Sequence, residues 1–157
     1  MKVHVLRSEV WIPHPRTEVF EFFSRAENLE ALTPPWLHFS ILSPTPIEMK
    51  TGTRIRYRLR LRGIPLRWES EITAWEPPHR FVDEQRRGPY DRWIHEHEFE
   101  EYEEGTTIRD TVQYSVVGGL FVDRVLVAPD LRRIFEFRRQ KISEIFYYRS
   151  RLIRLLG

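Results

Sequence analysis

The sequence contains no cysteine, which excludes a disulfide framework, a thiolate nucleophile and a thiolate metal site. It has no apolar run near the roughly 20 residues of a membrane span, and its first residues lack the apolar core of a signal peptide. Its 25 basic and 23 acidic residues leave a formal charge of only +2, which does not argue for a nucleic-acid partner. These absences predict a cytoplasmic protein with no membrane span.

The length and the first elements predict one mixed domain. With 157 residues, 41% of them hydrophobic, the chain can bury one sizeable core, so we expect a single domain over residues 1–157. Residues 3–12 alternate as in a strand, which Pro13 and Pro15 end. Apolar residues then recur near helical spacing over 19–32, up to Pro34, which predicts one helix or two short ones.

Between residues 36 and 117 the hydrophobic period changes to two, which predicts antiparallel strands with one face in water. In 53-TRIRYRLRLRG-63 every second residue is arginine, and a turn over Gly63-Ile64-Pro65 leads into the next strand. The outward pairs predicted across this turn are Arg60 with Glu69 and Arg58 with Glu71. Such ion pairs explain the arginines as solvated surface, whereas a nucleic-acid patch would have aromatic residues interleaved.

The stretch 91-DRWIHEHEFEE-101 places two histidines on one face of a predicted strand, between two aromatic residues. A slip of one residue would turn every side chain to the other face, so the apolar faces determine the register. The predicted pairs are Trp93 with Gln85, His95 with Asp83 and Val112, His97 with Phe81 and Asp110, and Phe99 with Ile108. Each histidine thereby gains a carboxylate neighbour. Because this inner row is too polar for a plain core, it predicts a cavity.

From Pro129 to Leu155, apolar residues recur at spacings of three and four, which predicts a long amphipathic helix over the concave face of the sheet. The predicted stripe comprises Leu131, Ile134, Phe135, Ile142, Ile145, Phe146, Leu152 and Ile153. Arg138 and Arg149 lie within it. Arg138 could reach into the cavity or extend to its rim.

The order of these elements resembles the START-like and polyketide cyclase/dehydrase (SRPBCC) superfamily. The stretches 81-FVDEQRRGPYDRWIHEHEF-99, 110-DTVQYSV-116 and 133-RIFEFR-138 resemble a bacterial ligand-binding branch of it. The resemblance implies an α+β helix-grip fold, in which a curved antiparallel sheet wraps around a long C-terminal helix and two short helices follow the first strand. Members bind lipids, hormones or polyketides, and only some are enzymes. A similar domain occurs fused to a nucleotide-sugar epimerase-like protein, which implies a possible partner of that type.

His95 and His97 allow three interpretations: structural or ligand-orienting groups, acid–base catalysts, or metal ligands. We favour the first and expect neither metal nor cofactor, because the register places the two carboxylates on opposite flanks of the strand. The leading hypothesis is the binding of a small, largely hydrophobic molecule that carries a polar or acidic group. The alternatives are a polyketide cyclase or aromatase-type enzyme that uses these histidines, and a module that regulates a partner protein. The expected ligand-binding residues are Trp68, Ile72, Phe81, Asp83, Gln85, Trp93, His95, His97, Phe99, Asp110, Tyr114, Phe135, Arg138 and Ile142.

Overall fold

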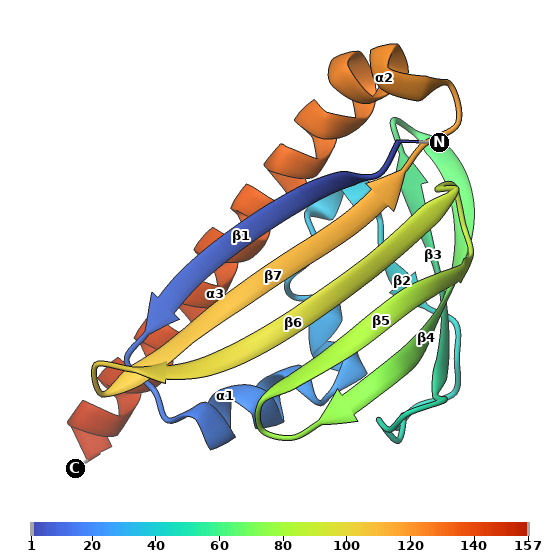
Figure 1. The fold of residues 1–157 in the computed structure, drawn as a ribbon. Coiled ribbons are helices and arrows are strands. Elements are labelled where there is room, and N and C mark those ends of the chain that lie inside the picture. Colours follow the sequence, from blue (N-terminus) through green and yellow to red (C-terminus); the bar gives the residue numbers. More distant parts are fainter. Residues whose placement is uncertain (1, 157) are drawn as a thin grey trace.

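The computed structural model describes residues 2–156, and the side chains of residues 120, 121, 148 and 150–154 lie outside the described part. A seven-stranded antiparallel sheet in the order β1-β7-β6-β5-β4-β3-β2 curves around the long helix α3 (Figure 1). The strands are β1 His4–Ile12, β2 Ser40–Ile41, β3 Arg54–Leu61, β4 Ile64–Glu76, β5 Arg80–Arg87, β6 Arg92–Tyr102 and β7 Gly105–Ser115. The helices are α1 Arg16–Phe23, the 3-10 turns η1 Ala26–Leu29 and η2 Pro35–Leu37, α2 Gly119–Val122, the π-helical η3 Asp123–Val127 and α3 Ala128–Leu156. This architecture confirms the predicted helix-grip fold.

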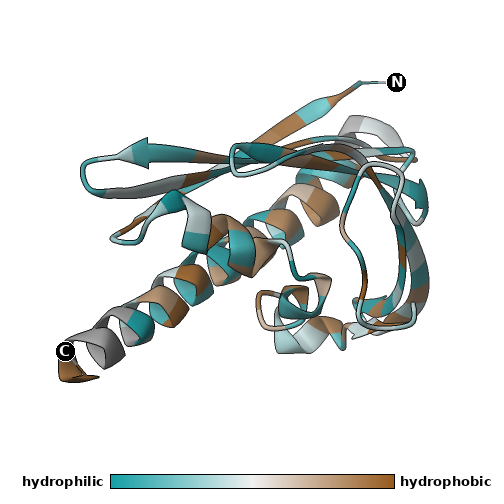
Figure 2. Cartoon of the chain, turned by 90° about the horizontal axis from the view of Figure 1, so that it is seen from below, coloured by the Kyte–Doolittle hydropathy of each residue, from teal (hydrophilic) through white to brown (hydrophobic). Residues whose placement is uncertain are grey.

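The segment after β1 lies on the concave side of the sheet, beside α3 (Figure 2). β1 ends at Ile12, as its two following prolines predict, and α1 begins directly after Pro15. The Ser24 N–H makes the last α-helical bond, to the Phe20 carbonyl, whereas the Arg25 N–H bonds to the Phe22 carbonyl only three residues back, and the chain continues in 3-10 turns. The predicted helical run therefore consists of the α-helix α1 and the 3-10 turn η1.

The register of β5, β6 and β7 agrees with the prediction. His97 lies opposite Phe81 and Asp110, and His95 lies opposite Asp83 and Val112. The β5–β6 ladder ends at Glu84 and Ile94, so the predicted pair of Trp93 with Gln85 is not part of it. This part of the sheet therefore places both histidines on the concave face, as expected.

The predicted register of β3 and β4 is wrong. Arg58 lies opposite Arg67 instead of Glu71, and Arg60 lies opposite Pro65 instead of Glu69. The chain turns at Arg62-Gly63, where φ is 50° and 79°, as a two-residue type I′ hairpin requires. The predicted turn lay further along the chain. Because the resulting shift is even, the same side chains still face inward, and alternation alone cannot detect the error.

The C-terminal helix packs on the concave face over most of its length (Figure 2). Leu131, Phe135, Ile142 and Phe146 of the predicted stripe are buried, whereas the side chains of Leu152 and Ile153 lie outside the described residues. Arg149 is exposed and stacks over Phe22 and Phe146. None of the described helices has an apolar stretch long enough to cross a membrane.

The main core lies toward the α1 end of the sheet and leaves the other end less filled. Rings from α1, β5, β6 and α3 form its centre, with Phe20, Phe81, Phe99 and Phe146 all buried. A separate cluster around Tyr57 and Trp68 covers the inner face of β3 and β4. The space between these two clusters is where the polar inner row lies.

Candidate functional site

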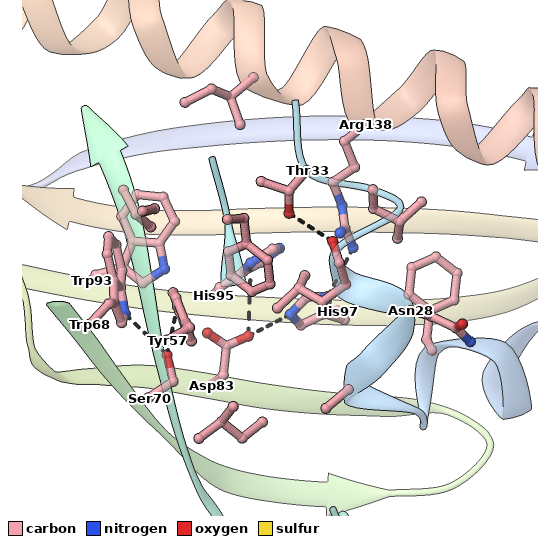
Figure 3. Close-up of a pocket in the computed structure, with 18 of the residues that line it drawn as sticks. Asn28, Thr33, Tyr57, Trp68, Ser70, Asp83, Trp93, His95, His97 and Arg138 are labelled. Carbon is pink, nitrogen blue, oxygen red and sulfur yellow. Dashed lines mark hydrogen bonds and ion pairs between the residues drawn. The ribbon is translucent and has the colours of Figure 1, made fainter. Parts of the chain in front are cut away.

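A cavity of about 180 Å³ lies between the concave sheet, the α1–η2 segment and α3 (Figure 3). For comparison, an engineered apolar cavity of about 150 Å³ is large enough to bind benzene. Phe22 and Leu32 form one side of the cavity, Ile55 and Leu59 another, and Leu131 contributes from α3. The apolar wall is therefore assembled from three distant parts of the chain.

Most of the residues predicted to bind a ligand line this cavity. They are Trp68, Ile72, Phe81, Asp83, Trp93, His95, His97, Phe135 and Arg138. Ligand contact by any of them remains a prediction.

The remaining residues of the predicted set are not among those that line the cavity. Phe99 and Ile142 belong to the main core, and Tyr114 packs in the cluster between β7 and the start of α3. Gln85 instead braces the β5–β6 turn, because its amide nitrogen donates to the Tyr90 carbonyl at 2.7 Å. Asp110 is buried at 4% exposure and bonds to His95 and Arg138.

The two histidine rings stack on each other, with centroids 3.6 Å apart and planes 27° apart. His97 Nε2 lies 2.7 Å from Asp83 Oδ2, and His95 Nε2 lies 2.8 Å from Asp110 Oδ1. The second nitrogen of each ring faces the other carboxylate, at 3.4 Å from His97 to Asp110 and 3.9 Å from His95 to Asp83. The sequence predicted two separate histidine–carboxylate contacts, but the structure joins all four groups in one network.

Arg138 completes this network from α3, and it is buried at 6% exposure instead of reaching the rim. Its Nε donates to Asp110 Oδ2 at 3.0 Å and its Nη2 to Asp110 Oδ1 at 3.2 Å. Nη2 also lies 3.3 Å from His97 Nδ1. The guanidinium carbon stands 5.4 Å from the centre of the Phe23 ring. Arg138 thus connects the helix to the polar row of the sheet.

The electrostatics of the network favour one protonated histidine. Two carboxylates against one guanidinium leave one negative charge, which one imidazolium neutralises. Burial lowers the pKa of His95, and the charge of His97 lowers it further against the opposing effect of Asp110. Burial also opposes charge on His97, but hydrogen bonds to Asp110 and Asp83 outweigh it and raise the pKa of His97. These opposite shifts favour protonation of His97 over His95.

Both carboxylates remain ionised for related reasons. Burial by itself would raise the pKa of Asp110, but the charge of Arg138 and hydrogen bonds from both histidines hold that pKa well below its usual range. Burial likewise opposes charge on Asp83, and the hydrogen bond from His97 with the nearby positive charges lowers its pKa. The site is therefore a compensated ion cluster within an apolar enclosure.

A second polar group in the cavity wall was missing from the predicted site. Trp68 Nε1 donates to Ser70 Oγ at 3.1 Å, and the Tyr57 hydroxyl lies 3.2 Å from the same oxygen (Figure 3). Burial raises the pKa of Tyr57, which keeps its hydroxyl neutral. Strand alternation already placed Tyr57 and Ser70 inward, which was the only signal for this site, because the two residues lie diagonally, with Tyr57 opposite Trp68 and Ser70 opposite Ile55.

Asp83, His95 and His97 form a possible metal-ligand group among the described residues, with one donor atom from each within 4.8 Å of the others. Zinc ligands lie about 2.0–2.2 Å from the ion. A metal here would have to replace the proton shared by Asp83 and His97. The expectation that no metal is bound remains a prediction.

Comparison with known proteins establishes the class of this chain. Residues 12–138 match the polyketide cyclase/dehydrase and lipid transport family, so the chain belongs to that family. No curated protein sequence is significantly similar to it.

Solved structures of other proteins share the fold. A protein from Thermus thermophilus is 24% identical with a TM-score of 0.69, covering 94% of this chain and 99% of that chain. The major latex-like protein 151 from Panax ginseng is 12% identical with a TM-score of 0.68, covering 92% and 97%. A nucleoside-diphosphate sugar epimerase from Corynebacterium glutamicum is 24% identical with a TM-score of 0.67, covering 93% of this chain but 30% of that chain. At these identities the likeness establishes the fold alone.

Proposed function

We propose that the protein binds a small, largely hydrophobic molecule that carries a polar group, within the cavity between the sheet and α3. The observation that carries this proposal is the buried ion cluster in the wall of an otherwise apolar cavity. Such a site matches the usual composition of small-molecule pockets, in which a few placed polar groups orient a ligand against apolar walls. A purely structural core would instead fill this volume with apolar side chains.

The free hydrogen-bonding capacity of the cluster indicates how the ligand is oriented. Asp83 is its more accessible carboxylate, with 19% of the side chain exposed against 5% for Asp110. Oδ2 of Asp83 accepts the hydrogen bond from His97, which leaves Oδ1 able to accept a hydrogen bond from a ligand hydroxyl or amine. An acidic ligand group would instead need Arg138, whose Nε and Nη2 already bond to Asp110. We therefore favour a neutral hydroxyl over a carboxylate as the polar group of the ligand.

Native mass spectrometry of the purified protein tests this proposal directly, and a bound small molecule of stoichiometric amount is the expected result. Titration with the neutral apolar fluorophore N-phenyl-1-naphthylamine provides a second readout, with saturable binding at one site. The variants Asp83→Asn and His97→Gln should weaken or retune binding. The exposed His79→Gln is the matched control and should bind as the native protein does. Non-saturable binding together with an empty protein in the mass spectrum would contradict the proposal.

The opposite pKa shifts of the stacked histidines favour a second candidate, a polyketide cyclase or aromatase-type enzyme. Neutral His95 could accept a proton from carbon next to a carbonyl, while His97 and Arg138 stabilise the negative charge that develops on the oxygen. Pairs of titratable groups with pKa values driven apart are typical of acid–base catalysis. Turnover of a poly-β-keto thioester that His95→Gln abolishes, with substrate affinity retained, would favour this enzyme over the binding protein.

Two further expectations remain predictions. One is a partner of the epimerase type, which the Corynebacterium chain motivates because a similar domain makes up part of its length. The other is a cytoplasmic location. Co-purification of an epimerase-like protein with the tagged chain from its native host tests the first, and cell fractionation tests the second.

A further inference from the structure

A second concave site lies along β3 and β4 at the β2 end of the sheet, and the outward-facing Arg58, Arg60 and Arg67 contribute to its lining. This groove has a volume of about 460 Å³. Its lining consists of the basic residues His38, Arg58, Arg60 and Arg67 together with Leu59, Pro65 and Leu66. The groove therefore combines a concave shape with a concentration of cationic groups.

Several arginines elsewhere on the outer face pair with carboxylates, although among the described residues Arg56 and Arg92 do not. Arg54 lies 2.9 Å from Glu69 and 3.0 Å from Glu71, and Arg80 lies 2.7 Å from Glu96. In contrast, no ion pair within the described part of the chain involves the three arginines of the groove. The positive charge of the groove is thus left without an internal counter-charge.

The register of the hairpin makes this arrangement unfavourable for the protein by itself. Arg58 and Arg67 are directly opposite each other in the β3–β4 ladder. Like charges in directly opposite positions destabilise a sheet, whereas an acidic residue at either position would form a favourable pair. Folding therefore does not account for this pair of arginines.

The backbone around the groove is held in place from two sides. Arg62 in the hairpin turn forms a bidentate ion pair with Asp130 of α3, in which Nε donates to Oδ2 at 3.0 Å and Nη2 donates to Oδ1 at 3.1 Å. On the opposite side, His38 adopts a left-handed conformation with φ 47°, and its N–H bonds to the Pro35 carbonyl at 3.2 Å. Ser40 of β2 pairs with Arg58. The basic side chains therefore project from a braced surface instead of a free loop.

We propose that this groove binds the phosphate group of a small molecule or of a lipid headgroup. Cβ atoms of directly opposite residues are about 4.5–5.5 Å apart, so Arg58 and Arg67 can both reach one phosphate, and Arg60 and His38 flank it. Guanidinium groups match phosphate oxygens with paired N–H donors. No phenylalanine, tyrosine or tryptophan of the described chain lines the groove, which disfavours stacked single-stranded nucleic acid. The groove and the cavity share Leu59 but no charged residue.

Isothermal titration of the native protein with sodium pyrophosphate at low ionic strength tests the proposal, with saturable binding as the expected result. Arg67→Glu should reduce the affinity at least tenfold, because it removes one charge-assisted contact and adds a repulsive charge. The same variant should melt at a higher temperature than the native protein, because it places a carboxylate opposite Arg58. Arg92→Glu, an equal charge change at the exposed start of β6, is the matched control and should retain most of the affinity.

Two further comparisons distinguish a lipid headgroup from a soluble molecule as the source of the phosphate. Flotation with phosphatidylcholine vesicles that contain phosphatidic acid, lost in Arg67→Glu, assigns the site to a lipid headgroup. Pyrophosphate binding without vesicle binding assigns it to a soluble phosphorylated molecule. Absence of saturable pyrophosphate binding, or equal losses in Arg67→Glu and Arg92→Glu, overturns the proposal. Tighter binding to oligonucleotides that increases with their length overturns it in favour of nucleic acid.

Discussion

The two faces of the sheet carry charge in opposite ways. On the concave face, Asp83, Asp110 and Arg138 are held with two histidines in one buried network whose charges compensate. On the convex face, Arg58 and Arg67 oppose each other in water without compensation. Burial makes an unpaired charge so costly that the inner arrangement must be nearly complete, whereas solvent lets the outer face keep an unfavourable pair. Charges exposed in this way are available to a partner.

Removing one charged member of the inner network should cause the largest loss of unfolding free energy. Arg138→Met leaves Asp110 buried without its counter-charge, and removal of one member of a buried ion pair typically costs about 3–5 kcal/mol of unfolding free energy. The outer-face variant Arg109→Met should cost far less, because the side chains of Arg109 and its partner Glu9 are 33% and 59% exposed, so solvent screens their interaction. Urea unfolding of both variants measures the difference. Equal losses would show that the inner network is not the more strongly coupled of the two.

Protonation should distinguish the two histidines. An NMR titration of the imidazole resonances should find His97 still charged at a pH where His95 is neutral. In His97→Gln, the pKa of His95 should rise, because the neighbouring positive charge that lowers it is gone. An unchanged His95 titration in this variant would show that the stacked rings are not coupled.

The raised pKa of His97 also determines the direction in which the stability of the folded protein changes with pH. Its contribution is complete below the ordinary histidine pKa of about 6.5 and is lost as pH rises through the folded-state value. Above the range in which the carboxylates titrate, the advantage of a His95→Gln variant over a His95→Gln/His97→Gln double variant, which differ only at position 97, should therefore shrink on the alkaline side. Thermal melts across this pH range measure it, and an advantage that grows with pH would contradict the assignment of the proton.

On the outer face the expected change is small and of opposite sign. Arg58→Glu places a carboxylate opposite Arg67, so it should raise the melting temperature by a few degrees at most. Arg56→Glu is a useful control, because Arg56 already lies opposite Glu69 and the change there creates a like-charge pair. Stabilisation by both variants would indicate that general charge reduction, and not the register, is responsible.

Metal removal should have no effect. We expect protein prepared without an affinity tag to contain less than stoichiometric metal by elemental analysis, and chelator to leave its melting temperature unchanged. The reason is that Asp83 and His97 already satisfy each other through a hydrogen bond of 2.7 Å. Stoichiometric zinc or iron, lost together with stability in His97→Ala, would replace the hydrogen-bonded network with a metal centre.

The predictability of the fold differed along the sheet for a physical reason. Across β5, β6 and β7, each strand carries a distinctive mixture of polar and aromatic inward residues, so a wrong register would oppose unlike groups. The β3–β4 hairpin instead alternates regularly, and two registers that differ by an even shift bury the same side chains. Only the left-handed conformations of Arg62 and Gly63 select between them. The type of strand was therefore evident in both places, and the register only in one.

The candidate site shows the same division. Alternation placed His95, His97 and Asp83 on one inner face, and the helical stripe brought Arg138 toward it. Which nitrogen meets which carboxylate could not be predicted, because the rings reach diagonally and each contacts both acids. Alternation also indicated that Tyr57 and Ser70 face inward. Their hydrogen bonding at Ser70 Oγ, together with Trp68, depends on how β3 and β4 are paired.

The sequence by itself determined the order of elements, the strands' inward faces and the polar row at the centre of the sheet, because these depend on periodicities of two and of three to four residues. Only the tertiary structure decided that Arg138 is buried, that the four ionisable groups beside it share one network, and that Arg58 opposes Arg67. These features depend on side-chain reach and on contacts between residues far apart in sequence. Local patterns do not contain those distances, so packing of α3 on the sheet and closure of the β3–β4 turn had to supply them.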